Sequence, residues 1–493
     1  MRYYSTRSKH DPLPGHQAVI RGLSPDGGLY VMDDINIKIP YQNLFHKSYQ
    51  EIAEAVLSAY FPDYDKETIK ACVSGAYDHA FDDPSIVPLT PFHDGSFMEL
   101  WHGPTSAFKD LALTILPHLL TAAYRMDQRN DTVAILTATS GDTGKAALSG
   151  FADVPHTDIT VFYPADGVSA VQKKQMVTSR GKNVHVIAVE GNFDDCQRMV
   201  KEACSDPSVK AACSGVTISS ANSINIGRLV PQVVYYFSTY IRLVENGSIQ
   251  DGDPVTFVVP TGNFGDIFAG YLAKRAGLPI GRLIVASNDN NVLTDFIRTG
   301  TYNRNRPFHE TISPSMDILI SSNLERLLFF ASGEDARTVS SCMEQLKEQG
   351  SYTVSDELLK TIQADFSAYW CDQEHCRNEI RDLFEQEHIL IDPHTSVGLS
   401  ALHQYRAEGN TEYAVVLSTA SPYKFARDVL AAIEGNACED PFAAIRRLAE
   451  LSGMKVPAGL AELESLPERF HEVIPASEGI ARIASRMKEL SHD

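Results

Sequence analysis

The chain has 493 residues, of which 43% are hydrophobic and 22% are charged, and its formal net charge is −20. This length predicts about two to four domains with the composition of an ordinary globular protein. The negative charge, without a basic cluster beyond short pairs, argues against a nucleic-acid partner. No apolar run is long enough for a membrane span, no apolar signal segment is evident and the eight cysteines are scattered. We therefore expect a cytoplasmic protein with no membrane partner.

The predicted elements alternate between strands and helices over most of the chain. Residues 1–95 mix turn-rich segments with an amphipathic helix and predict a small N-terminal α+β domain. The first alternating series has predicted strands at 132–140, 158–164 and 183–191, and helices at 143–152, 169–179 and 193–206. A second series has a long helical segment at 226–245, strands at 254–262, 281–288 and 412–420, and helices at 264–277 and 423–435. Such alternation is typical of β-α-β units and predicts parallel sheets.

This pattern predicts an α/β protein with three structural parts. The predicted parts are an N-terminal domain (1–95), a small α/β domain (131–230) and a large α/β domain (96–130 and 231–493) with a mostly helical insert at about 300–390. In open α/β sheets, ligands bind beyond the carboxyl ends of the strands. The loops that follow the predicted strands are therefore the first places to search for a site.

The loop after the strand 132–140 is rich in hydroxyl groups and glycine. Thr139, Ser140 and Thr143 could bind an anion together with the backbone N–H groups of the following helix. The same residues could equally cap that helix, with the glycines allowing a tight turn. Both interpretations stay open from this loop alone.

A second loop follows the strand 254–262 and opens a helix with Gly262, Asn263, Phe264 and Gly265. Glycines allow a phosphate to approach the backbone closely. The loop has neither the G-x-G-x-x-G spacing of dinucleotide sites nor a Walker lysine. We therefore favour a cradle for a single phosphate over a purely structural turn.

Two more segments carry polar side chains at helix starts. Asn222, Ser223 and Arg228 surround the start of the helical segment 226–245, and the arginine fork suits an anion, although a surface arginine is the alternative. Ser418 and Thr419 follow the strand 412–420, and one of these hydroxyls could face a ligand ring. A helix cap is the simpler interpretation of this last segment on its own.

Lys109, in "HGPTSAFKD", is either a solvated surface residue or a covalent catalyst. A cofactor that bears both an aldehyde and a phosphate would use a lysine for a Schiff base and a glycine-rich loop for the phosphate. The lysine and the phosphate loops together therefore indicate pyridoxal 5′-phosphate (PLP). Cys371, His375 and Cys376 form the only tight group of cysteines and histidine, and we interpret it as a polar helix without a metal.

Several short motifs occur in the order found in one known family. They are "YYSTR", "GLSPDGGLYV", "HGPTSAFKD", "TATSGDTGKAA", "NSINIGRL", "PTGNFGDIFAGY" and "DPHTSVG". With them the chain resembles the threonine synthase family, PLP enzymes of fold type II, the tryptophan synthase β-like fold. This resemblance implies two parallel-sheet α/β domains and a small N-terminal α+β domain. The sequence departs from the family at Ser421, where relatives often have histidine, and at Ser106 and Met32.

The resemblance also implies a role for individual residues. The implied cofactor-binding residues are Lys109 for the Schiff base, Gly262, Asn263, Phe264, Gly265 and Asp266 for the phosphate, Thr419 (with Ser418 as the fallback) for the pyridine nitrogen, and Asp142 near the 3′ oxygen. The implied substrate-binding residues are Thr139, Ser140 and Thr143 for a carboxylate or phosphate, and Asn222, Ser223 and Arg228 for the substrate phosphate. For His394 a structural and a catalytic role are equally compatible with the motif.

The implied reaction converts O-phospho-L-homoserine and water to L-threonine and phosphate, by γ-elimination followed by addition of water at Cβ. The alternative is a related phospho-lyase that makes 2-oxobutyrate from O-phosphothreonine or O-phosphohomoserine, because the same residues would serve both. A nucleotide-dependent oxidoreductase and a PLP-free binding module are less consistent with the motifs. The oligomeric state is expected to be a monomer or a homodimer.

Overall fold

The computed structural model describes residues 1–139, 141–166 and 168–492. Ser140, one of the predicted substrate-binding residues, lies outside the described residues, so its role stays a prediction. Within the described ranges, no helix combines the length and the apolar character needed to cross a membrane.

The N-terminal part is an α+β unit, as predicted. Its antiparallel sheet has the order β2-β1-β3, with β1 (Tyr3–Ser5), β2 (Ser8–Leu13) and β3 (Tyr30–Met32). Its helices are α1 (Gly15–Arg21), α2 (Tyr49–Tyr60) and α3 (Lys66–Tyr77). Helix α2 starts where Ser48 and Glu51 form a reciprocal capping box, which satisfies two backbone donors. Its apolar face, which includes Ile52 and Val56, is fully buried in the core.

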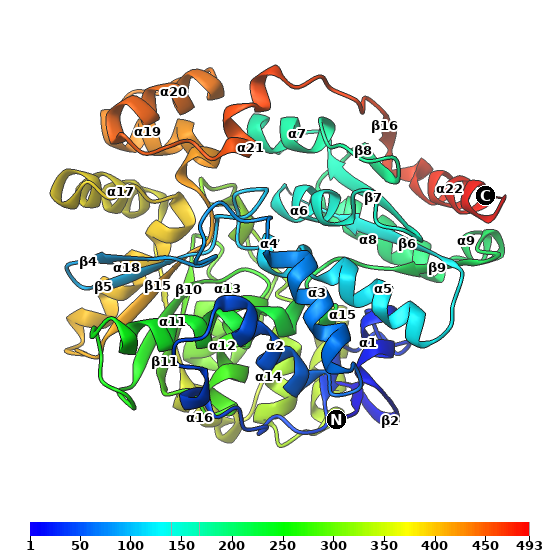
Figure 1. Cartoon of the computed structure of the whole chain (residues 1–493), viewed down its shortest axis with the longest axis horizontal. Coiled ribbons are helices and arrows are strands. Elements are labelled where there is room, and N and C mark those ends of the chain that lie inside the picture. The colour runs from blue at the N-terminus through cyan, green and yellow to red at the C-terminus, as the bar shows by residue number, and fades with distance from the viewer. Residues whose placement is uncertain (140, 167, 493) are drawn as a thin grey trace.

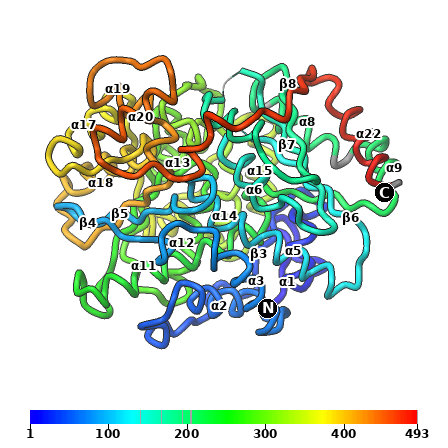
Figure 2. Tube along the Cα trace, turned by 45° about the horizontal axis from the view of Figure 1, so that its top comes forward, coloured from blue at the N-terminus to red at the C-terminus, as the bar shows by residue number. Residues whose placement is uncertain are grey.

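A five-stranded parallel sheet carries the loop with Thr139 and Asp142. Its order is β16-β8-β7-β6-β9, with β6 (Thr132–Ala138), β7 (Thr157–Pro164), β8 (Val184–Glu190), β9 (Val216–Ser219) and β16 (Val473–Pro475). Its helices are α6 (Asp142–Phe151), α7 (Ala170–Val177), α8 (Phe193–Ser205), α9 (Pro207–Ala212) and α22 (Gly479–His492). The C-terminal helix α22 packs beside α8 and α9, although these segments are far apart in the sequence (Figure 2).

A six-stranded sheet carries the other predicted loops. Its order is β14-β11-β10-β15-β5-β4, with β4 (Leu89–Phe92), β5 (Gly95–Glu99), β10 (Val255–Pro260), β11 (Ile280–Ser287), β14 (Phe366–Trp370) and β15 (Ala414–Ser418). All neighbouring strands are parallel except β4 and β5. In Figure 1 the strands of this sheet lie in a different half of the molecule from β6 to β9. The buried strands are nearly continuous apolar runs, which is typical of a parallel sheet that is covered on both faces.

Further helices surround and join the sheets. Those nearest the site residues are α4 (Asp110–Leu113), α5 (Leu116–Met126), α10 (Ile226–Leu229), α11 (Val233–Glu245), α12 (Gly265–Arg275), α18 (Pro393–Ala407) and α19 (Ala426–Glu434), with the short 3₁₀ helices η2 (Val230–Gln232) and η4 (Pro422–Phe425). The others are α13 (Val292–Thr299), α14 (Leu324–Ala331), α15 (Ala336–Gln349), α16 (Asp356–Asp365), α17 (Gln373–Glu387), α20 (Pro441–Ser452) and α21 (Ala458–Ala461). A small hairpin of β12 (Thr301–Asn303) and β13 (Ser351–Thr353) lies in the predicted helical insert.

Two strands pair with a sheet other than the one that their predicted domain suggests. The domain boundaries themselves stay predictions. Strand β4 falls within the predicted N-terminal part but pairs with β5 in the six-stranded sheet. Strand β16 falls within the predicted large domain but pairs with β8 in the five-stranded sheet. Sheet membership depends on pairing between distant segments, and periodicity along the chain carries no information on that pairing.

Candidate active site

Backbone hydrogen bonds hold the Lys109 loop against the loop that follows β15. The Phe108 N–H donates to the Thr419 carbonyl at 2.8 Å, and the Ser421 N–H donates to the Ser106 carbonyl at 3.0 Å. Ser106 has a left-handed φ of 59°, which lets the loop turn towards this partner. These contacts bring Lys109 and Thr419, two residues predicted to bind the cofactor, to the same place.

Lys109 is a mostly buried lysine. Its side chain is 12% exposed, and its Nζ lies 3.7 Å from Asp142 Oδ2 and 4.4 Å from the centre of the Phe108 ring. Burial lowers the pKa of the Lys109 amine below its ordinary value, and the Asp142 carboxylate opposes that shift. The solvated-surface interpretation of Lys109 is therefore wrong. A buried amine with a lowered pKa is suited to act as a nucleophile and a base.

The loop after β6 places Asp142 at the first position of α6. Gly141 before it has a φ of 146°, and a Cβ there would lie 2.5 Å from the Gln172 side chain, so glycine is needed. The Thr139 hydroxyl oxygen accepts hydrogen bonds from the N–H groups of Gly141 and Gly144, both at 2.9 Å. Thr139 thus caps this turn with its side chain, and its role towards a substrate stays a prediction. The half-buried Thr143 hydroxyl makes no hydrogen bond with any described residue.

The Asp142 carboxylate is surrounded by donors from three other segments. Lys424 Nζ lies 2.6 Å from Oδ1, Gln172 Nε2 donates to Oδ1 at 2.8 Å, and Ser315 Oγ donates to Oδ2 at 3.3 Å. Burial by itself would raise the pKa of Asp142, but the Lys424 cation, together with Lys109 when that amine is protonated, holds it well below its usual range. Sequence reasoning did not identify Lys424, Gln172 or Ser315. The segments of Gln172 and Ser315 show no local pattern that predicts a site. Lys424 is the lysine of "TASPYKF", next to the predicted Ser418 and Thr419, but its spacing gave it no role.

In the loop after β10, the residue before α12 supplies no side-chain cap, and Asp266 in the first turn accepts from the Ile267 N–H at 2.9 Å. Phe264 precedes the helix in a left-handed conformation with a φ of 63°. The Gly262 and Asn263 carbonyls are held by Ser321 Oγ at 2.7 Å and by Asn323 Nδ2 at 2.9 Å. The carbonyls are therefore occupied by the protein, whereas the positive end of the helix is available to an anion.

Close packing restricts the shape of this same loop. A Cβ at Gly262 would lie 2.8 Å from the Ser315 carbonyl oxygen, and one at Gly265 would lie 3.8 Å from the Ser223 Cβ. Two predicted anion-binding segments, 222–228 and 262–266, thus lie next to one another.

Asp266, on the first turn of α12, is buried, and burial raises its pKa to about 6, against the opposing effect of Lys109.

Arg228 is buried in the turn that begins α10. It is 3% exposed, its Nη1 donates to the Ala221 carbonyl at 2.9 Å, and its Nε has no hydrogen-bond partner among the described residues. Burial lowers the pKa of its guanidinium to about 10. The surface-arginine alternative is therefore wrong. A buried guanidinium with an unpaired N–H fits a site for an anion.

Asn222 and Ser223 complete this segment, but neither caps a helix. The Asn222 amide donates to the Ala138 carbonyl at 3.4 Å, which ties the segment to the end of β6. The cap of α10 is Asn225 instead, whose side chain accepts from the Gly227 N–H at 2.9 Å. The partly exposed Ser223 hydroxyl makes no hydrogen bond with any residue that the structure describes.

The two hydroxyls after β15 differ in their partners. Ser418 Oγ accepts from Trp101 Nε1 at 3.1 Å and from Thr395 Oγ1 at 3.2 Å. The Thr419 hydroxyl has no hydrogen-bond partner in the described parts of the chain. Thr419 is thus better placed than Ser418 to serve a ligand atom. The buried Ser421 Oγ also lacks a partner there.

His394 is held by protein groups on both ring nitrogens. Nδ1 lies 2.6 Å from Asp392 Oδ1, and Nε2 accepts from the Ser315 N–H at 3.1 Å. The ring is 2% exposed and packs edge-on against Phe425. This arrangement supports the structural role of His394, because it positions Ser315 beside Asp142.

The donor set fits PLP. The uncapped start of α12 suits its phosphate, and the Lys109 amine suits its aldehyde. The unpaired Thr419 hydroxyl suits its pyridine nitrogen. Close packing at Gly262 leaves no room for a side chain in the phosphate loop.

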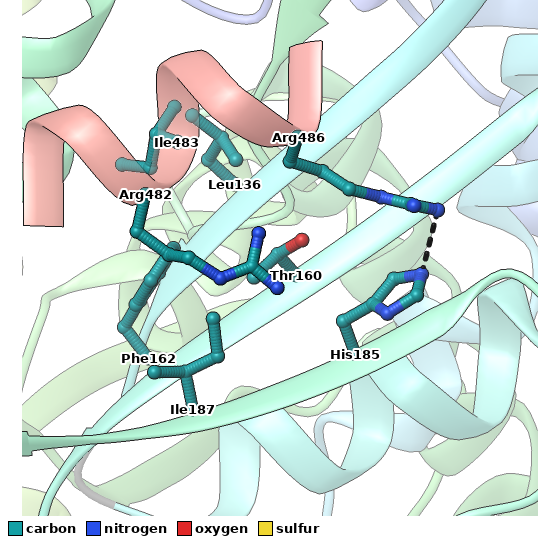
Figure 3. Close-up of a pocket in the computed structure, with 8 residues that line it drawn as sticks. All are labelled: Leu136, Thr160, Phe162, His185, Ile187, Arg482, Ile483 and Arg486. Atoms are coloured by element: carbon teal, nitrogen blue, oxygen red, sulfur yellow. Dashed lines mark hydrogen bonds between the residues drawn. The ribbon is translucent and has the colours of Figure 1, made fainter. Parts of the chain in front are cut away.

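Two cavities elsewhere contain none of the predicted site residues. One, of about 10 Å³, lies between α22 and the five-stranded sheet, where Figure 3 shows Arg486 beside His185. The other, of about 520 Å³, lies between α5 and the start of β6. The candidate site is thus defined by its side chains and loops, and it lies apart from both cavities.

Comparisons with known proteins agree with this geometry. Residues 97–421 match the family "Pyridoxal-phosphate dependent enzyme", residues 2–77 match "Threonine synthase N terminus", and residues 395–483 match "Threonine synthase, C-terminal". The chain is 38% identical over 440 residues to threonine synthase from Pseudomonas aeruginosa, covering 86% of this chain and 89% of that protein. It is 39% identical over 461 residues to threonine synthase from Corynebacterium glutamicum, covering 90% and 94%.

The solved structures lead to the same family. PLP-bound threonine synthase from Brucella melitensis is 37% identical, with a TM-score of 0.88 and full coverage of both chains. This likeness confirms the predicted fold type II arrangement of two parallel-sheet domains with a small N-terminal domain. It also confirms PLP as the cofactor. The chain belongs to the threonine synthase family of PLP-dependent enzymes.

Proposed function

We propose that this enzyme converts O-phospho-L-homoserine and water to L-threonine and phosphate. The observation that carries the proposal is the buried Lys109 amine, 3.7 Å from Asp142, on a loop bonded to the loop of Thr419. The positive charge of Arg228 also lowers the pKa of this amine. The site thus combines a base with a second anion-binding segment, as a phosphorylated amino acid requires.

Lys109 is the proposed base. PLP, when bound, supplies the electron sink that stabilises negative charge at the substrate carbon. The Lys109 amine takes the Cα proton, because its lowered pKa favours the neutral form, which can accept a proton. The same amine then holds that proton within the buried site and can return it. In the net reaction, the Cγ–O bond to the phosphate breaks, Cβ loses one proton and Cγ gains one to become the methyl group. The hydroxyl of a water molecule is bonded to Cβ in the product, and the remaining proton of that water leaves with the phosphate.

Two groups of residues are proposed to hold the ends of the substrate. Arg228, Asn222 and Ser223 bind the departing phosphate, and the unpaired Nε of Arg228 supports this assignment. Thr143, with Thr139 and Ser140 beside it in the sequence, binds the substrate carboxylate.

A hydroxyl, not a carboxylate, is proposed to face the pyridine nitrogen. Thr419 supplies it, supported by the fact that no described residue hydrogen-bonds to its hydroxyl. A neutral hydroxyl does not hold a proton on the ring nitrogen as an aspartate would, so the electron sink is weaker. The enzyme therefore relies more on Lys109 and the charges around it.

Product analysis tests the proposal. The PLP-loaded enzyme is incubated with O-phosphohomoserine, and threonine, phosphate and 2-oxobutyrate are measured together. We expect threonine and phosphate in equal amounts. If 2-oxobutyrate is the main product, the alternative phospho-lyase reaction is correct, because the intermediate then leaves before water adds at Cβ.

We further propose that the enzyme works in the cytoplasm as a monomer or a homodimer. The support is that the seven cysteines whose thiols the structure describes are all free, as a reducing compartment allows. Sedimentation of the PLP-loaded enzyme distinguishes the two oligomeric states, and a larger assembly would contradict both.

A further inference from the structure

A second lysine, Lys424, is buried against the same carboxylate as Lys109. Its Nζ lies 2.6 Å from Asp142 Oδ1 and donates to the Thr105 carbonyl at 3.0 Å, and its side chain is fully buried. It belongs to η4, five residues after Thr419 in the sequence. A buried charge is strongly unfavourable unless it is paired, so this lysine depends on Asp142.

The two lysines use different oxygens of Asp142. Lys424 and Gln172 occupy Oδ1, whereas Lys109 and Ser315 face Oδ2. Lys424 also holds Thr105, four residues before Lys109, through its carbonyl oxygen. One residue thus contacts both the carboxylate that faces Lys109 and the loop that carries Lys109.

We propose that Lys424 is a positioning residue that keeps Lys109 an uncharged amine and holds it beside Asp142. With Lys424 in place, one carboxylate is shared by two amines, and a proton on Lys109 would add a second positive charge to the cluster. Like charges close together in a buried site disfavour the charged form of the second group. The proposal rests on the proposed role of Lys109 as base.

Two cations that face Lys109 act in the direction that this role requires, and two carboxylates act against it. Burial lowers the pKa of Lys109 most, Asp142 opposes the shift, and the Lys424 and Arg228 cations lower the pKa further, while Asp266 raises it. Removal of the Lys424 charge has two effects. It removes a repulsion, and it leaves Asp142 to pair with Lys109 alone. Both effects raise the pKa of Lys109.

Competitive labelling of lysines tests the proposal without substrate or cofactor. The full-length chain, freed of PLP, is treated with trace acetic anhydride at a series of pH values, and the Lys109 peptide is quantified by mass spectrometry. For Lys424→Met we expect the midpoint of Lys109 labelling to move up by about one pH unit or more. Lys424→Arg keeps the charge and should leave the midpoint near that of the wild type.

A matched control uses another paired lysine. Lys274 Nζ lies 2.7 Å from Asp365 Oδ1 and donates to the Gly281 carbonyl at 2.8 Å, so it has the same two kinds of partner as Lys424. Lys274→Met should leave the Lys109 midpoint unchanged. If Lys424→Met does not fold, Lys424→Gln replaces it, because its amide can keep hydrogen bonds to Asp142 and Thr105 while removing the charge.

The PLP-loaded enzyme provides the second readout. The acid limb of the pH profile of kcat, which reports groups in the enzyme–substrate complex where Lys109 acts as a free amine, should move upwards in Lys424→Met and return in Lys424→Arg. An unchanged or lowered Lys109 midpoint in both uncharged variants overturns the proposal, even if activity is lost. The proposed function is tested by the products of the wild-type enzyme. If those products contradict it, the result of the Lys109 labelling experiment still stands.

Discussion

The starts of α6 and α12 are built from the same two residues and behave differently. Each helix follows a parallel strand and starts at a Gly-Asp pair. Gly141 precedes α6, which begins at Asp142, whereas Gly265 and Asp266 are the first two residues of α12. At α6 the Thr139 side chain accepts hydrogen bonds from two N–H groups of the turn. At α12 the residue before the helix, Phe264, provides no cap, and among the described side chains Asp266 accepts from one first-turn N–H, that of Ile267, at 2.9 Å. We therefore expect the cofactor phosphate at the start of α12, where the residue before the helix leaves the first N–H groups uncapped.

The two aspartates differ for the same reason, which is the identity of their neighbours. Asp142 lies between Lys424 and Lys109, which hold its pKa below the usual range. Asp266 accepts one backbone hydrogen bond, and burial raises its pKa to about 6. A carboxyl group that is protonated more easily repels a nearby phosphate less. Two similar sequences thus give a charged carboxylate at the start of α6 and a weakly acidic carboxyl group at the start of α12.

The largest expected effect comes from removal of Lys109, whose amine lies 3.7 Å from Asp142. We expect Lys109→Ala to reduce turnover of O-phosphohomoserine by at least about 10³-fold and to lose the visible absorbance band of the bound cofactor. Turnover is measured as phosphate release, and the band by spectroscopy. Lys274→Ala, which removes another ion-paired lysine, is the control. If Lys109→Ala kept both the turnover and the band, Lys109 would not be the Schiff-base lysine.

The second prediction concerns Asp266 and pH. Its pKa in the folded chain is raised to about 6, so the folded state binds the proton more tightly than the unfolded state. The contribution of Asp266 to stability should therefore fall as pH rises from about 4 through 6, by an amount on the order of 2 kcal/mol. Asp266→Asn, which keeps an oxygen for the Ile267 N–H, should lose less stability than the wild type in that window, since the buried Asp110, whose pKa is also raised to about 6, titrates in both proteins.

Chemical denaturation of the cofactor-free chain at about pH 4.5 and pH 7.5 measures the difference. The informative quantity is the change in unfolding free energy of Asp266→Asn relative to the wild type between the two pH values. An equal change in both proteins would show that Asp266 does not titrate in the folded state as described.

The third prediction tests the backbone of the phosphate loop. Gly262→Ala places a Cβ 2.8 Å from the Ser315 carbonyl oxygen, and a backbone atom cannot move aside easily. We expect the affinity for PLP to fall about tenfold, which corresponds to about 1.4 kcal/mol. Gly281→Ala is the control, because its closest neighbour would be a proline carbon at 3.3 Å. Equal PLP affinities of the two variants, measured by titration, would argue against a tight loop.

The smallest expected effect concerns the cap of α6. Thr139→Val removes the oxygen that accepts from the N–H groups of Gly141 and Gly144, and should lower the free energy of unfolding by about 1 kcal/mol. Thr139→Ser keeps that oxygen and should stay close to the wild type. PLP affinity should change little, since the phosphate is expected at the other helix start. If Thr139→Val lost more free energy of PLP binding than free energy of unfolding, the phosphate would be placed at the start of α6 instead of α12.

Local patterns predicted much of this fold and site. The strand and helix segments from 132 to 288 lie within a few residues of the observed elements, because apolar periodicity reports which residues face a core. The loops after β6, β10 and β15 could be identified because a parallel sheet gathers ligands at the carboxyl ends of its strands. The roles of the individual residues in those loops remain predictions.

Long-range contacts explain what the patterns missed. Lys424, Gln172 and Ser315 come from three segments that meet only around Asp142. The capping role of Thr139 and the unpaired Thr419 hydroxyl likewise depend on which groups lie within hydrogen-bonding distance. Strands β4 and β16 join sheets that their positions in the chain did not indicate.

The sequence by itself determined the α/β class, and it indicated the loops and the lysine where a PLP site is predicted. These features are local, since they depend on residue type and on spacing along the chain. Only the tertiary structure decided that Lys109 is buried, that Asp142 is charged and shared with Lys424, and that Asp266 is weakly acidic. The physical reason is that burial and the nearest charges determine the protonation of a side chain, and folding brings those charges together from distant parts of the chain.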